Sequence, residues 1–157
     1  MGQKSRSKNL LWITLCYGVL GILLTPIHSQ ELQCEGDCQD GKGTVTWPNG
    51  AKYIGQFKNG SRHGQGTMTL PDGTIYSGQF INDVEEGKGT YKWPDGRTYN
   101  GGIKDGKMHG TGKHAWPDGT NYVGQFLNGQ MHGQGTFTFA DGRANKGRFV
   151  NNQFAGK

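Results

Sequence analysis

The sequence predicts an all-β protein: an elongated single-layer antiparallel meander of tandem β-hairpin repeats, preceded by an N-terminal hydrophobic helix. Three observations predict this fold. Motifs recur with a 23-residue period, and within each period apolar and polar residues alternate between turn signals. Glycine supplies 29 of the 157 residues, while hydrophobic residues make up only 32%. Such a chain is too poor in aliphatic side chains to fill a large closed core.

The first segment, residues 1–29, has the layout of an export signal. Lys4, Arg6 and Lys8 precede an apolar run over residues 10–27, and polar residues follow. This order is typical of a cleaved signal peptide, and the run is also just long enough for an uncleaved signal-anchor. Either interpretation sends the rest of the chain across a membrane. We expect a periplasmic or extracellular protein, or one anchored in the membrane by residues 10–27.

The second segment, residues 30–43, is interpreted as a degenerate N-terminal cap of the repeat array. It contains Cys34 and Cys38, which in an oxidising compartment can close a small disulfide loop. Two free thiols remain the alternative. A metal site is disfavoured, because two ligands are too few.

The repeat array is predicted over residues 44–157. Each unit carries a tyrosine, a glycine two residues later and a large apolar residue four residues later. In the first full unit, residues 51–58 form one strand, Asn59-Gly60 a tight turn, and residues 66–70 a second strand. A Pro-(Asn/Asp)-Gly turn then leads into the next unit. The last unit is eroded: Asn145 replaces its tyrosine, and the chain ends before a second strand is expected.

Strand alternation predicts one aromatic and one polar face. Counting parity through the units places 14 of the 15 aromatic residues outside the leader on one face, with only Phe154 left over. Glycines on that face leave room for rings to lie flat over the backbone. Because a single-layer sheet has no second layer to cover these rings, we expect the aromatic face to bind a partner. The candidate binding residues are Tyr53, Phe57, Tyr76, Phe80, Tyr99, Tyr122 and Phe126.

Residues 53–66, YIGQFKNGSRHGQG, resemble the repeat unit of the MORN family, and the units at Tyr99 and Tyr122 resemble it nearly as fully. The unit at Tyr76 departs from it, with Asp83 in place of the turn glycine and Glu86 in place of the histidine. The resemblance implies a hairpin sheet and a non-enzymatic module for protein association, dimerisation or membrane scaffolding. We therefore expect a protein partner or self-association.

Other functional classes are disfavoured. No nucleophile has a local signature, so we expect no catalytic residues and no cofactor. His63, His109 and His132 share one slot of the repeat, but His109 and His132 would lie about 10 Å apart, too far to share a metal ion. Nucleic acid binding is not expected, because the chain beyond the leader has 14 basic and 12 acidic residues.

The alternative function is peripheral binding of anionic lipid headgroups by lysines of the polar face. Basic and acidic residues are interleaved along the sequence, which favours a solvated face of mixed charge instead. The basic residues concerned are Lys52, Lys58, Arg62, Lys88, Lys92, Lys104, Lys107 and Lys113.

Overall fold

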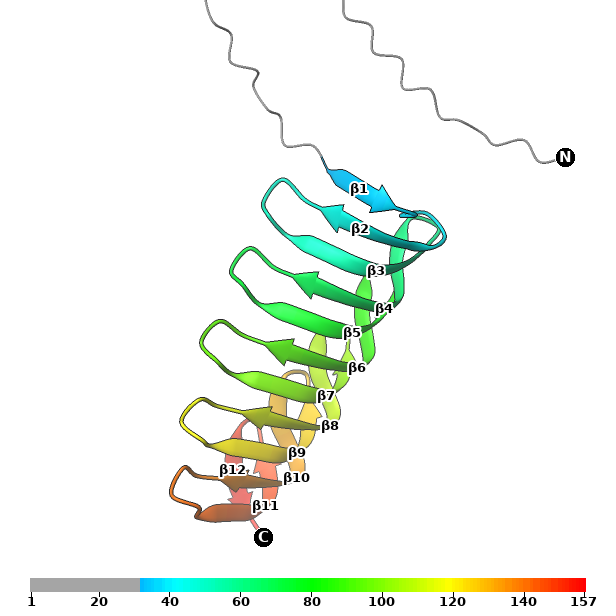
Figure 1. Cartoon of the computed structure of the whole chain (residues 1–157). Helices are drawn as coiled ribbons and strands as arrows, with labels where there is room; N and C mark the ends of the chain where they lie inside the picture. The colour runs from blue at the N-terminus through cyan, green and yellow to red at the C-terminus, as the bar shows by residue number, and fades with distance from the viewer. Residues whose placement is uncertain (1–31) are drawn as a thin grey trace, which may run out of the picture.

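The computed structural model describes residues 32–157, which form one antiparallel sheet of 12 strands in chain order. The hairpins stack in one direction from β1 to β12 (Figure 1). The predicted single-layer meander is confirmed, whereas the predicted N-terminal helix lies outside the described residues. The strands are β1 Gln33–Gly36, β2 Lys42–Thr46, β3 Lys52–Lys58, β4 Ser61–Thr69, β5 Ile75–Ile81, β6 Val84–Lys92, β7 Thr98–Lys104, β8 Lys107–Ala115, β9 Asn121–Leu127, β10 Gln130–Thr138, β11 Ala144–Val150 and β12 Gln153–Gly156.

Two kinds of turn connect the strands. The turn between β3 and β4 has positive φ angles at Asn59 (49°) and Gly60 (75°), the backbone of a type I′ turn, whose twist suits a hairpin. The turns between repeats line up along the opposite edge of the ribbon (Figure 1). In one of these, Asp72 Oδ1 accepts a hydrogen bond from the Thr74 amide at 2.8 Å, which holds the turn closed.

The tip of each hairpin is also bonded to the repeat before it. The Asp83 amide, at the β5–β6 tip, donates to the Arg62 carbonyl in β4 at 2.9 Å. Tips further along the array repeat the contact: Gly106 N to Glu85 O at 3.0 Å, Gly129 N to Met108 O at 2.8 Å, and Asn152 N to Met131 O at 3.0 Å. Neighbouring repeats are therefore joined outside the strand ladder as well as within it.

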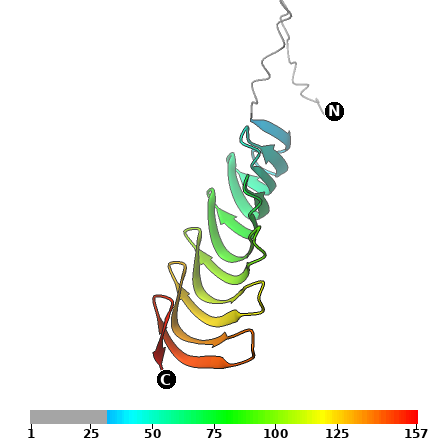
Figure 2. The same cartoon turned by 90° about the vertical axis from the view of Figure 1, so that its left-hand side faces the viewer.

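A β-bulge bends the hairpins. Gly64 and Gln65 of β4 have no partner in β3, and Gly64 takes a φ of +64°. The Gln56 side chain fills the gap, since its Oε1 accepts a hydrogen bond from the Gln65 amide at 2.7 Å. Gln125 bonds the Gln134 amide in the same way. Because a bulge bends its strand, the strands are arched rather than flat, as Figure 2 shows.

The last repeat differs from its prediction in two ways. A short second strand, β12, does form, because Val150 and Gln153 pair across the Asn151-Asn152 turn. Phe154, which the parity count leaves over, joins the aromatic face: it is the cross-strand partner of Phe149, and their ring centroids are 5.3 Å apart. The two-residue turn sets this register, because Val150 opposite Gln153 places Phe149 opposite Phe154.

Candidate functional site

The seven predicted binding residues lie side by side on one face, as parity requires, but all are buried. The four tyrosines are at most 2% exposed, and the three phenylalanines at most 7%. The expectation that these rings face water was wrong. They form the core of the array together with Val45, Ala51, Met68, Ile103 and Phe149.

The rings are buried because they cover each other and the backbone. The Tyr53 ring packs edge-on against Phe57 in its own repeat, with centroids 5.1 Å apart, and against Phe80 in the next repeat, at 5.0 Å. Tyr122 makes the same two contacts with Phe126 and Phe149. In both cases a phenylalanine covers the tyrosine ring of the preceding repeat. This arrangement gives a one-layer sheet a continuous aromatic core.

Glycine makes room for these tyrosines. One glycine per strand from β2 to β11 forms a row across the sheet, each directly opposite the next, and the tyrosine rings lie over this row. A Cβ atom on Gly101 would lie only 2.5 Å from the Tyr99 hydroxyl oxygen, so no larger residue fits. The Tyr99 hydroxyl donates to the Gly102 carbonyl at 2.8 Å. Burial raises the pKa of Tyr99 to about 12, so the phenol is neutral at physiological pH.

What remains accessible on this face is a second row of large apolar side chains beside the inter-repeat turns, which we call the aromatic rim. Its members share one slot of the 23-residue period and are partly buried or exposed: Trp47, Leu70, Trp93, Trp116 and Phe139. His114 lies between two of the indoles, 5.4 Å from Trp93 and 4.2 Å from Trp116 between ring centroids. Strand alternation places the rim residues on the aromatic face, but they are not among the predicted binding residues, although they recur with the same 23-residue spacing.

His114, which lies between two indoles of the rim, is a buried polar side chain, at 7% exposed. Burial, and then the positive charge of Arg97, lower its pKa below the ordinary value. Its Nε2 atom is buried without a hydrogen-bond partner. His114 therefore acts as a neutral ring in the stack at neutral pH.

In the atypical repeat at Tyr76, the two residues that depart from the repeat pattern, Asp83 and Glu86, bond to the neighbouring repeats. Asp83 Oδ1 forms an ion pair with Arg62 Nε at 3.0 Å, and the Arg62 guanidinium lies over the Phe80 ring, 5.2 Å from its centroid. Burial alone would raise the pKa of Asp83, but hydrogen bonds from Arg62 hold it below the usual range. Glu86 accepts a hydrogen bond from the Asp105 amide of the following turn at 3.1 Å. The residues that break the repeat pattern thus have structural roles.

The opposite face, which we call the groove face, is hollowed. An open groove of about 890 Å³ runs across β4 to β9. The glycine row forms its floor, and small polar side chains such as Thr67, Ser77 and Asn100 line it. Lys88 also lies in this lining, and Lys113 in β8 is the cross-strand partner of two lining residues, Asn100 and Val123.

A family model described as MORN repeat matches the chain over residues 39–52, 53–75, 76–96, 99–121 and 122–142. The chain belongs to the MORN repeat family. MORN repeats are generally modules for interaction with proteins or membranes. The last repeat, with its missing tyrosine, lies beyond the matched residues.

Two solved structures are similar to this MORN array at low sequence identity. One is the TCP domain of SAS-4 (dCPAP) in complex with a proline-rich motif of Ana2 (dSTIL) of Drosophila melanogaster, with 10% identity over 83% of this chain and 99% of that chain, and a TM-score of 0.25. The other is the TCP10c domain of Drosophila melanogaster Sas-4, with 14% identity over 76% of this chain and 100% of that chain, and a TM-score of 0.23. A comparison with curated proteins finds no match.

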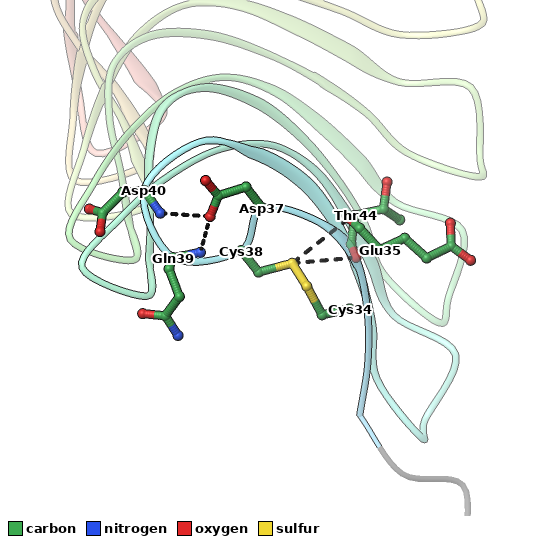
Figure 3. The surroundings of a disulfide bond; sticks show 7 residues. All are labelled: Cys34, Glu35, Asp37, Cys38, Gln39, Asp40 and Thr44. Carbon is green, nitrogen blue, oxygen red and sulfur yellow. Dashed lines mark hydrogen bonds between the residues drawn. A yellow bond between two sulfur atoms is a disulfide. The ribbon is translucent and has the colours of Figure 1, made fainter. Parts of the chain in front are cut away.

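The N-terminal end of the MORN array is closed by a disulfide-bonded loop. Cys34 in β1 is bonded to Cys38, with Cα atoms 6.4 Å apart, as Figure 3 shows. Asp37 Oδ1 accepts hydrogen bonds from the amides of Gln39 and Asp40, both at 3.0 Å (Figure 3). The loop thus ends the sheet with a short, cross-linked strand at its open edge.

The histidines of the repeat slot lie next to the bulges, not in the turns. His63, His109 and His132 are partly buried, and each has a buried Nδ1 atom without a hydrogen-bond partner. Within residues 32–157, no three acidic, histidine or cysteine side chains are grouped as metal ligands. In the same part of the chain, no helix is long and apolar enough to cross a membrane. The predicted signal or anchor at residues 10–27 lies outside the described residues.

Proposed function

We propose that this MORN array is a non-enzymatic scaffold, exported or membrane-tethered, that binds a protein partner or a second copy of itself through the aromatic rim. The observation that carries the proposal is the row of partly buried and exposed apolar side chains along one edge of a rigid sheet. Tryptophan is enriched among residues that dominate the energy of protein interfaces. Accessible apolar rows of this kind usually mark an interaction site.

The burial of the tyrosine and phenylalanine rows supports the rim as the contact surface. Those rings are occupied in holding the repeats together, so removing them unfolds the array instead of testing an interface. The rim indoles are stacked on that core and keep part of each ring accessible. A stack fixed in this way loses little side-chain entropy on binding.

The test is the double variant Trp93→Ser/Trp116→Ser in the full chain. We expect a loss of self-association, measured by sedimentation velocity in neutral detergent, or of partner crosslinking in the host. For self-association, the matched control is Ile54→Ser/Val123→Ser, which removes two aliphatic side chains, 52% and 50% exposed, from the opposite face. Equal association of the rim variant, the control and the unchanged protein would refute the proposal.

Export is a separate part of the proposal, and it rests on the order of basic, apolar and polar residues in the leader. The intact mass of the native protein in soluble and membrane fractions tests it. A mass lacking about 29 residues in a soluble exported fraction supports cleavage. The full mass in membranes supports an anchor, and the full mass in the cytosol contradicts both.

A further inference from the structure

We propose that the groove face binds an extended acidic peptide segment of a partner protein, one that carries aliphatic side chains among its carboxylates. This surface lies on the other side of the sheet from the aromatic rim. The inference therefore does not depend on the rim as a docking site.

The first support is the separation of charge in space. All strand lysines point away from the tyrosines, together with one arginine: Lys42, Lys52, Lys58, Lys88, Lys92, Lys104, Lys107, Lys113, Lys146 and Arg148. Only two acidic strand residues in the described part of the chain share this face, Glu35 and Glu86. The interleaving seen along the sequence disappears in the fold, because most of the acidic residues lie in turns.

Most of the acidic turn residues already have hydrogen-bond or ion-pair partners. Asp95 and Asp141 each bond the turn amide two residues later and pair with the arginine at that position, at 2.6 Å. Within residues 32–157, the ion pairs involve only arginines at turns or on the aromatic face, and none of the groove-face cations. The lysines of the groove face therefore remain available to an anionic ligand.

Like charges also face each other there. Lys104 and Lys107 are direct cross-strand partners. Two cations in this position repel, and cross-strand pairs of like charge destabilise a sheet. An anionic ligand lying across β7 and β8 relieves that repulsion, which gives it an advantage over a neutral one.

The shape of the face favours a narrow, extended ligand. Most of the side chains that line the groove, such as Ser77, Thr90 and Thr111, are small, so a second backbone can approach the sheet closely there. Thr67, Thr90 and Asn100 provide hydrogen-bonding groups along its length. A planar bilayer does not reach a recessed floor of this kind, whereas a peptide running across the strands does.

The exposed aliphatic side chains of this face distinguish a peptide from other polyanions. Large aliphatic side chains stand exposed among the lysines of this face: Ile54, Ile81, Val84, Val123 and Leu127, all between 41% and 52% exposed. Val123 is part of the groove lining. A nucleic acid or a sulfated sugar chain carries charge without aliphatic side chains, whereas an acidic peptide with leucine or valine satisfies both features of the surface.

The experiment measures binding of a fluorescein-labelled 16-residue peptide of alternating Glu and Leu or Val, by anisotropy, to the full chain in neutral detergent micelles. We expect Lys88→Glu/Lys113→Glu to weaken binding by about tenfold or more, since two attractive charges become repulsive. The matched control, Arg97→Glu/Arg143→Glu, makes the same change in net charge at turns of the aromatic face. We expect it to weaken binding less than threefold, and we expect the peptide with Gln for Glu not to bind.

Further variants identify the ligand class. Val123→Ser should weaken peptide binding several-fold while leaving the binding of a heparin oligosaccharide or a single-stranded oligonucleotide unchanged. The proposal is overturned if both glutamate variants lose binding equally, if the Gln peptide binds as well, or if phosphatidylserine micelles or the other polyanions bind while the acidic peptide does not. Unchanged circular dichroism and melting temperature show that each variant remains folded.

Discussion

Replacing Tyr99 by alanine tests the core of the array at its centre. The ring is fully buried, packs edge-on against Phe126 at 5.1 Å and covers Gly101 and Gly112. Neither glycine has a side chain that can fill the space. The cavity left by the ring is therefore opened over bare backbone, in the middle of a stack whose repeats contact only their neighbours.

The expected loss follows from these contacts. Truncation of a large buried aromatic side chain costs about 3–5 kcal/mol, and Tyr99 should fall in this range. The conservative variant Tyr99→Phe keeps the ring and removes only the hydrogen bond to the Gly102 carbonyl, 2.8 Å away. That bond contributes about 0.5–1.5 kcal/mol, so the two variants should differ by about 3 kcal/mol. Against a typical total stability of about 5–15 kcal/mol, Tyr99→Ala is a severe change.

Urea unfolding, followed by tryptophan fluorescence and far-UV circular dichroism, measures both variants. Val123→Ala is the control, because this side chain in β9, on the far side of β8 from Tyr99, is 50% exposed on the groove face and should change stability by no more than about 0.5 kcal/mol. A Tyr99→Ala variant that loses less than about 1 kcal/mol would show that the ring is not part of a cooperative core. That result would favour the sequence-based prediction, in which the tyrosines bind a partner.

Three further outcomes are expected. The first is His114→Phe, which introduces the residue found at the same position of the next repeat, Phe137. It should reduce the loss of stability on acidification. Because the pKa of buried His114 is lowered, the unfolded chain binds the proton more readily than the folded chain as the pH falls through about 6.5. Urea midpoints at pH 7.5 and 5 measure this, and an unchanged pH dependence contradicts it. Cys34→Ser/Cys38→Ser removes a disulfide that closes a five-residue loop, and should lower the free energy of unfolding by about 2 kcal/mol. Faster amide hydrogen exchange should be confined to β1 and β2. Faster exchange along the whole array would contradict this local effect. Gly129→Ala, at a φ of +86° with free space around it, should cost about 1–2 kcal/mol from backbone strain, whereas Gly112→Ala, whose Cβ would meet the Tyr99 ring, should cost more; equal melting temperatures would contradict this order.

The repeat itself could be predicted from the sequence because its signals are local. Asn59-Gly60 fixes a two-residue turn, and alternation from Tyr53 to Phe57 assigns a face to each side chain. These features depend on residues only a few positions apart. The strand order follows from them, because strands joined by short turns pair with the strands before and after them in the chain.

The burial of the predicted binding residues could not be predicted from such local signals. It depends on how one repeat covers the next: Phe80 packs against Tyr53 although 27 residues separate them in the sequence, because β4 pairs with both β3 and β5 and brings the two rings onto one face. The grouping of lysines opposite acidic turns was missed for a related reason. Lys104 and Asp105 are adjacent in the chain, but one ends a strand on the groove face and the other begins a turn.

The bonds from each hairpin tip to the preceding repeat give the array a direction. Asp83, Gly106, Gly129 and Asn152 all donate backward, to a strand that the ribosome has already made. A hairpin that folds after its N-terminal neighbour therefore meets acceptors that are already in place, and the array can be completed one unit at a time from the N-terminal end. Removal of repeats from the C-terminal end leaves every remaining tip anchored, whereas removal from the N-terminal end leaves the next tip without its acceptor. Gradual shortening from the two ends should accordingly have unequal effects on the surviving repeats.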